Sequence, residues 1–139
     1  MALQASALKP GDTYSERVVE NLSRTQIVQY AGASGDYNPL HTDEVYTVQA
    51  AGYPSVFAHG MLTMGLTSKM LVNYVGAGRL TKFGVRFTNQ VWPGDTLDAK
   101  ATVEAVREEG GVKLVDLKLS TTNQDGKEVV SGNATARVD

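Results

Sequence analysis

Two residues able to carry acid–base chemistry stand close together in one irregular segment of this chain. Asp36 and His41 belong to the run GDYNPLH at 35–41, which glycine and proline keep out of regular structure. A carboxylate and an imidazole that hold one water form a workable general acid–base pair, and an imidazole titrates near neutrality. The alternative is structural, with Asp36 capping a helix and His41 bonding to backbone. Spacing alone leaves both interpretations open.

A site for negative charge is predicted at the start of the most apolar stretch. The run AHGM at 58–61 opens this stretch. Free N–H groups at a helix start point outward and carry the positive end of the helix dipole. Because Gly60 has no side chain, a substrate carbonyl can approach its N–H closely, as in an oxyanion hole. The alternative is a glycine required for close packing at a crowded helix start.

Three further polar residues are candidates with simpler structural roles. We interpret His59 as a hydrogen-bonded histidine at a helix entry. Asn38 and Ser68 are each able to satisfy backbone groups. A metal site built from the two histidines and neighbouring aspartates is not favoured, because their spacing matches no zinc or non-haem iron pattern. We therefore expect no metal.

Helical patterns are expected to position these residues. Ser23 and Gln26 fit a capping box at the start of a first helix, which glycines at 32 and 35 weaken and end. Asn38 can cap a short turn with Pro39 in its first position. We expect a second short helix over 43–51. A third over 57–75 is apolar on nearly every face, which predicts enclosure by other elements.

The second half of the chain alternates with a period of two, which predicts strands with one buried and one wet face. Turn signals at 93–95, 110–111 and 125–126 separate these segments and predict an antiparallel meander. The simplest way to bury both the helix and the apolar face is a curved antiparallel sheet wrapped around the long helix, an α+β architecture. The length of the chain, 139 residues, predicts a single domain over 1–139. The expected strands cover 83–88, 97–105, 115–120 and 130–138, with a weaker one at 13–19.

Composition excludes several classes of function. The chain has no cysteine, so disulfides and thiolate nucleophiles are absent. Net charge is −2 without a basic block, so we expect no nucleic-acid partner. The most apolar stretch, residues 56–75, contains a histidine, a lysine and an asparagine, so we do not expect it to span a membrane. The first ten residues hold no apolar run of signal-peptide length. We expect a cytoplasmic protein without a membrane partner.

The run YAGASGDYNPLH at 30–41 resembles the signature of MaoC-like, R-specific enoyl-thioester hydratases and dehydratases. The family pattern Gly-Asp-x-Asn-Pro-x-His is matched at all its fixed positions. The AHGM run is a second family landmark, and Ser68 falls eight residues after Gly60, where many members carry a serine. The runs VRF at 85–87 and PGD at 93–95 resemble the family's next strand and turn. The resemblance covers about residues 10–138.

The resemblance implies a hot-dog fold and a reaction. Asp36 and His41 would hold the water that adds across a trans-2-enoyl thioester to give an (R)-3-hydroxyacyl thioester, or the reverse dehydration. Asn38 would help orient the site, the Gly60 N–H would bind the thioester oxygen, and Ser68 would support this arrangement. Either member of the acid–base pair remains a candidate to protonate C2.

The same resemblance implies that no separate cofactor is needed, because coenzyme A or an acyl-carrier pantetheine arrives as part of the substrate. It also implies a homodimer or higher homo-oligomer, with a heterodimer as the alternative. Two competing functions remain open. One is an acyl-CoA thioesterase on the same fold, and the other is a non-catalytic acyl-binding or partner subunit.

Overall fold

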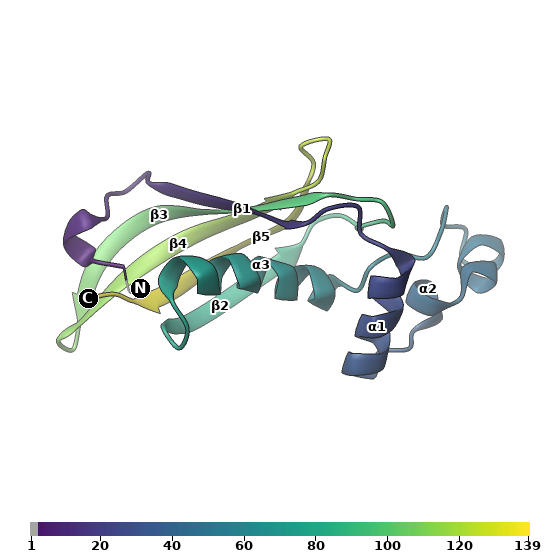
Figure 1. The fold of residues 1–139 in the computed structure, drawn as a ribbon, viewed down its shortest axis with the longest axis horizontal. Coiled ribbons are helices and arrows are strands. Elements are labelled where there is room, and N and C mark those ends of the chain that lie inside the picture. Colours follow the sequence, from purple (N-terminus) through teal and green to yellow (C-terminus); the bar gives the residue numbers. More distant parts are fainter. Residues whose placement is uncertain (1–2) are drawn as a thin grey trace.

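A curved five-stranded antiparallel sheet lies along a long helix in the computed structural model, which describes residues 3–139 (Figure 1). This confirms the predicted α+β, hot-dog architecture. In the described part of the chain no helix is both long and apolar enough to cross a membrane. The strands are β1 (Thr13–Val19), β2 (Leu80–Phe87), β3 (Leu97–Glu109), β4 (Val112–Thr122) and β5 (Glu128–Arg137), and the long helix is α3 (Gly60–Val75).

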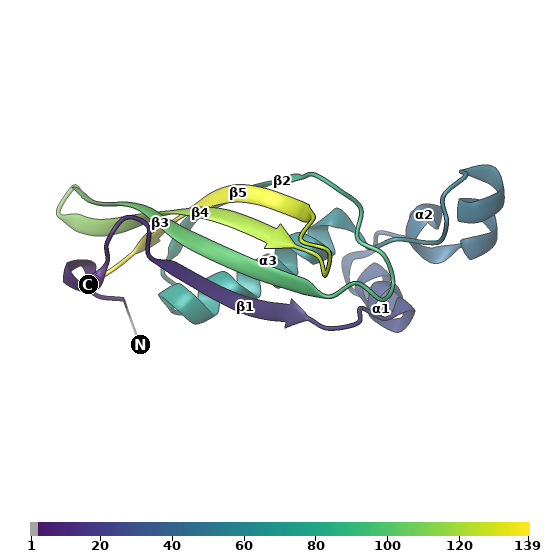
Figure 2. The ribbon, with the colours of Figure 1, turned by 90° about the horizontal axis from the view of Figure 1, so that it is seen from above.

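A helical lobe projects beyond one end of the sheet, opposite the end where the C-terminus and residues 5–7 lie (Figures 1 and 2). Its elements are α1 (Arg24–Ser34), α2 (Pro39–Thr42) and a π-helical turn (Tyr46–Ala50). The chain passes from β1 into this lobe and returns into α3, so the lobe interrupts the path from strand to helix. A short 3-10 turn, Ala5–Ala7, precedes β1.

The order of the strands corrects one prediction. Strands β3, β4 and β5 form the expected meander, but β2 pairs with β5 at the far edge, in the order β1-β3-β4-β5-β2. The predicted meander was therefore wrong for β2. Alternation identifies which face of a strand is buried, but it carries no information on which strand lies beside it.

The core lies between the concave face of the sheet and one side of α3. Met70, Leu71 and Val75 of the helix are fully buried there. The expectation that α3 is enclosed on every side is wrong, because Met61 is 56% and Val72 41% exposed. A single sheet covers only the helix face turned toward it.

Helix boundaries follow the capping residues closely. Ser23 and Gln26 form the predicted capping box of α1, which continues past Gly32 to a left-handed Gly35 with φ 76°. Asn38 caps α2 as predicted, with its side chain accepting from the Leu40 N–H. The helix expected over 43–51 is present over 44–50, but all of it beyond residue 45 is the π-helical turn.

The long helix begins three residues later than predicted. Residues 57–59 lie outside the helix because their backbone groups bond elsewhere: the Phe57 N–H donates to the Leu40 carbonyl (3.2 Å) and the Ala58 N–H to the Val91 carbonyl (2.8 Å). These bonds tie the entrance of α3 to the lobe on one side and to the β2–β3 connection on the other. Gly76 ends the helix, as predicted.

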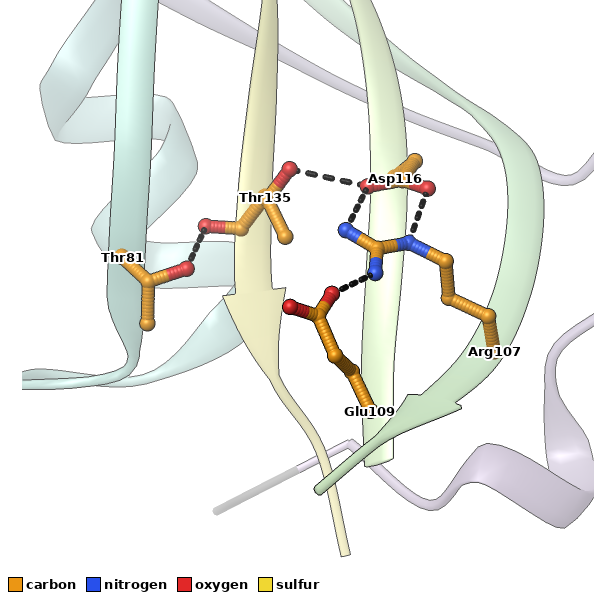
Figure 3. A network of polar contacts seen from close by, with 5 residues as sticks. All are labelled: Thr81, Arg107, Glu109, Asp116 and Thr135. Carbon is orange, nitrogen blue, oxygen red and sulfur yellow. Dashed lines mark hydrogen bonds and ion pairs between the residues drawn. The ribbon is translucent and has the colours of Figure 1, made fainter. Parts of the chain in front are cut away.

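A polar network links four strands on the sheet, with Thr81 of β2 donating to the Thr135 carbonyl of β5 (3.1 Å) (Figure 3). Asp116 of β4 accepts from Arg107 Nε of β3 (2.7 Å) and from Thr135 Oγ1 of β5 (2.8 Å). The Arg107 guanidinium holds the pKa of Asp116 below its ordinary value. Arg107 also contacts Glu109. The network lies on the sheet, outside the helical lobe that carries the candidate catalytic residues.

Gly132→Ala should destabilise the protein by about 1–3 kcal/mol, as overpacking does. A Cβ at Gly132 would lie 2.1 Å from the Gly84 carbonyl oxygen and 2.9 Å from Val85 Cα, both backbone atoms of β2. Gly84→Ala is the matched control, because a Cβ there meets nothing within 4 Å. Urea unfolding of both variants measures the difference, and equal midpoints would show that β2 and β5 do not approach this closely.

Candidate active site

Three side chains from separate segments converge where the helical lobe meets α3. Asp36 lies between α1 and α2, His41 lies within α2, and His59 immediately precedes α3. One polar atom from each lies within 4.8 Å of the others. The imidazoles of His41 and His59 stack with ring centroids 3.9 Å apart. The fold therefore brings together the two residues predicted to share a water.

One hydrogen bond fixes the tautomer of His41. Its Nδ1 lies 2.6 Å from the Phe57 carbonyl oxygen. Because a carbonyl oxygen only accepts, Nδ1 must carry the proton, and the neutral ring then has its lone pair on Nε2. Burial lowers the pKa of His41 below its ordinary value of 6.5, and the bond to Phe57 opposes this shift only in part. At neutral pH His41 is an uncharged proton acceptor.

If His41 is the predicted general base, the rate of the reaction that it serves should therefore fall only on the acid side of pH 6.5. The neutral form is needed to accept a proton from water, and its lowered pKa keeps His41 neutral down to the folded-state pKa. The unfolded chain binds this proton more readily. Stability is therefore lost as pH falls from 6.5 toward the folded-state pKa, and is constant below it. A pH profile of kcat/KM measures this fall in rate on the acid side. A midpoint of the fall above pH 6.5 would contradict the assignment of His41 as the proton acceptor.

Asp36 is held by hydrogen bonds on both its side chain and its backbone. Its Oδ1 accepts from the Asn38 N–H (3.2 Å), and its backbone carbonyl accepts from His59 Nε2 (2.9 Å). Asn38 in turn caps α2 through the Leu40 N–H (2.9 Å). Asn38 thus shapes the turn that carries both Asp36 and His41.

His59 is the hydrogen-bonded histidine at a helix entry that the sequence indicated. It is only 1% exposed, and because Nε2 donates to the Asp36 carbonyl, its buried Nδ1 is left without a partner among residues 3–139. The Tyr30 ring also packs against the His59 ring in a T-shaped arrangement, with centroids 4.8 Å apart. His59 therefore locks the Asp36 backbone to the entrance of α3 and backs the His41 ring.

The three converging groups do not fit a metal ion in this arrangement. The two imidazole planes are inclined by 25° and stacked 3.9 Å apart. Each nitrogen lone pair lies in its own ring plane, so the two lone pairs lie in two separate, nearly parallel planes. A zinc ion needs both nitrogens aimed at it from about 2.0–2.1 Å. One ring would have to rotate out of the stack.

Gly60 lies at a cavity of about 270 Å³ beside α3. It is the first residue of the helix, and within the described residues its N–H has no acceptor. A Cβ at Gly60 would lie 3.0 Å from the Phe87 ring and would have to displace it, so glycine also serves close packing here. Both interpretations of Gly60 therefore have structural support. The cavity is lined by Phe57, Ala58, Gly60, Thr63, Phe87, Thr88, Asn89, Gln90, Val91 and Val129.

Ser68 is the one predicted site residue that the fold does not bring near the others. Eight residues of α-helix separate it from Gly60, about 12 Å along the axis. Its hydroxyl donates to the Gly65 carbonyl (2.6 Å) in the preceding turn. The Phe57 carbonyl, which orients His41, was missed from the sequence, because a backbone group leaves no side-chain signal.

Comparison with known proteins agrees with this geometry. The model of the MaoC-like domain matches residues 5–125 of the chain. The chain belongs to the MaoC-like domain family. This MaoC-like chain is 33% identical over 133 residues to the (R)-specific enoyl-CoA hydratase of Rhodospirillum rubrum, covering 94% of the chain and 88% of that protein.

Solved structures of R-hydratases have the same fold as this chain. The MaoC-like chain superimposes on the R-hydratase PhaJ1 from Pseudomonas aeruginosa with a TM-score of 0.85 and 27% identity, covering 99% of the chain and 86% of that protein. Other relatives are longer proteins, of which this chain matches only a part. The MaoC-like chain is 43% identical over 67 residues (46% of the chain) to 3-hydroxyacyl-thioester dehydratase Y of Mycobacterium tuberculosis, and the match covers 23% of that protein.

Proposed function

We propose that this MaoC-like chain adds water to trans-2-enoyl thioesters to give (R)-3-hydroxyacyl thioesters, and catalyses the reverse dehydration. The observation that carries the proposal is the approach of Asp36 and His41 to within 4.8 Å, with the lone pair of His41 on Nε2. The names of the R-hydratase relatives support it. Two proton-handling groups and a free helix-start N–H are the parts that this reaction needs.

The proposed step balances with these three groups alone. The oxygen of water forms a bond to C3 while His41 Nε2 takes one of its protons. The electrons of the C2–C3 double bond move onto the thioester oxygen, which the Gly60 N–H stabilises as its negative charge grows. The Asp36 carboxylate accepts the second O–H of the water and stabilises the imidazolium. His41 then returns its proton to C2, which completes the addition.

We propose that no separate cofactor takes part. The thioester itself makes C2 acidic, so the carbonyl needs only the N–H donor described above. Coenzyme A or the pantetheine of a carrier protein would enter as part of the substrate. Dialysis against a chelator should leave the hydration rate unchanged, and loss of activity that zinc restores would contradict this part.

We further propose that the chain forms at least a homodimer. Strand β2 is an edge of the sheet, and the exposed Met61, Val72 and Phe87 lie on or beside the uncovered face of α3. An unpaired edge and an apolar face beside it favour pairing with a second copy. Light scattering should give at least twice the chain mass; a monomer at micromolar concentration would overturn this part.

A direct assay tests the reaction. Purified protein and crotonyl-CoA should lose the absorbance of the conjugated thioester, and a dehydrogenase specific for (R)-3-hydroxyacyl-CoA should oxidise the product. A thiol reagent in a parallel reaction reports release of coenzyme A. Thiol release without hydration would make the protein a thioesterase, and neither signal would favour a non-catalytic subunit.

A further inference from the structure

We propose that Glu44 is a positioning residue for His41, acting through the backbone of residues 55–58, which we call the strap. The strap carries the Phe57 carbonyl that binds His41 Nδ1. The inference rests on the proposed function insofar as it assigns the histidine a role in turnover. Glu44 lies between α2 and the π-helical turn and takes no part in the step described above.

The Glu44 carboxylate joins three segments of the lobe. Its Oε2 accepts from the Val56 N–H of the strap (3.1 Å), and its Oε1 accepts from Arg24 Nη2 at the start of α1 (3.2 Å). Val56 is itself buried. A buried N–H that loses its acceptor costs free energy unless the backbone moves to find another partner. The bond to Val56 therefore constrains where the strap can lie.

Each of three consecutive N–H groups in the strap has a different acceptor. Val56 donates to the Glu44 carboxylate, and Phe57 and Ala58 donate to backbone carbonyls at residues 40 and 91. Glu44 supplies the only side-chain acceptor of the three, so it is the one that a substitution can remove. The next residue along, Phe57, is the one whose carbonyl orients His41, so a shift at Val56 passes directly to the imidazole.

The influence of Glu44 on His41 is geometric rather than electrostatic. Within the part of the chain that the structure describes, no hydrogen bond or ion pair joins the side chains of Glu44 and His41. Both line a second cavity, distinct from the one at Gly60 and also of about 270 Å³, together with Arg24 and Val56. Among neighbouring side chains, His59 lowers and Asp36 raises the pKa of His41 electrostatically, and Glu44 is not among the groups that shift it. An uncharged acceptor of the same length should therefore replace the carboxylate.

Three variants separate this role from general stability. Glu44→Ala removes the acceptor, Glu44→Gln keeps an acceptor of equal reach without the charge, and Asp98→Ala is a control. Asp98 also pairs with an arginine, and the exposures of that pair (47% and 56%) match those of Glu44 and its arginine (46% and 59%). Enoyl-CoA hydration should fall about tenfold in kcat for Glu44→Ala, as a displaced catalytic group predicts, and stay near wild type in the other two.

A second readout does not depend on turnover. The chain has only two histidines, so the imidazole N–H protons are resolved by NMR, and His41→Gln assigns them. The Nδ1 proton of His41, in its 2.6 Å bond, should lie far downfield in the wild type and in Glu44→Gln. In Glu44→Ala it should shift upfield or broaden through exchange.

The outcomes are separable. Wild-type kcat and an unchanged Nδ1 resonance in Glu44→Ala would overturn the proposal, as would an equal loss in Glu44→Gln or in the Asp98 control. If Glu44→Ala does not fold, Glu44→Asp replaces it, because it keeps the charge and shortens the reach; a wild-type resonance there would also overturn the proposal. Absence of hydration by the wild type would refute the proposed function, while the resonance still tests the link between Glu44 and His41.

Discussion

Asp36→Asn and His41→Gln should each lower kcat for hydration by at least about 10², the usual contribution of an acid–base group. The amide of asparagine keeps an oxygen for the Asn38 N–H but cannot stabilise an imidazolium through charge. Glutamine cannot take the proton that His41 Nε2 accepts. Steady-state kinetics on crotonyl-CoA measure both effects, and KM should change much less than kcat.

The control for these two variants is a measurement of their folding stability. Both side chains are at least partly exposed, so unfolding midpoints should remain close to wild type. If the two residues act on one water, the double variant should lose little more than the more damaging single one. If the loss in the double variant equals the product of the two single losses, the two residues act independently. Normal turnover by both single variants would show that Asp36 and His41 have only structural roles, as a helix cap and a backbone hydrogen-bond partner.

Gly60→Pro should lower kcat by about 10²–10³, the range observed when one oxyanion donor is removed. Proline has no N–H, yet the backbone can accept it here. Gly60 is the first residue of α3, where proline is well tolerated. The preceding His59 has φ −61° and ψ 137°, an extended conformation that suits a residue before proline. No helical hydrogen bond is lost, because this N–H has no acceptor within the helix.

Gly60→Ala is the matched control for the proline variant. Both add a Cβ that must displace the Phe87 ring from 3.0 Å, but only alanine retains the N–H. The ratio of their kcat values therefore isolates the donor from the packing effect. Equal losses in the two variants would show that Gly60 serves packing against Phe87 alone.

The site was predictable where local sequence fixes local structure. The run at 35–41 places a carboxylate and an imidazole on one irregular turn, and the Asn38 cap that shapes this turn is itself a local signal. His59 was expected at a helix entry, but its bond to the Asp36 carbonyl spans 23 residues and no spacing rule predicts it. The same holds for Phe57 and Glu44, whose roles depend on the strap lying against the lobe.

The fold shows the same division between local and distant information. Alternation identified the four strands after residue 80, because it records which side chains face the core, whereas the strand at 13–19 gave only a weaker signal. It did not place β2 beside β5, since that pairing depends on how the chain crosses the sheet after residue 87. The predicted start of α3 was wrong because apolar residues continue through the non-helical strap, which backbone bonds to residues 40 and 91 hold out of the helix.

The most direct test of the central claim follows the oxygen atom of water into the product. Wild-type protein and crotonyl-CoA are incubated in heavy-oxygen water, and the products are separated and analysed by mass spectrometry. Hydration by Asp36 and His41 predicts an intact thioester with the heavy oxygen on C3, formed far more slowly by His41→Gln. Heavy oxygen in a free carboxylic acid, with coenzyme A released and C3 unlabelled, would contradict the account.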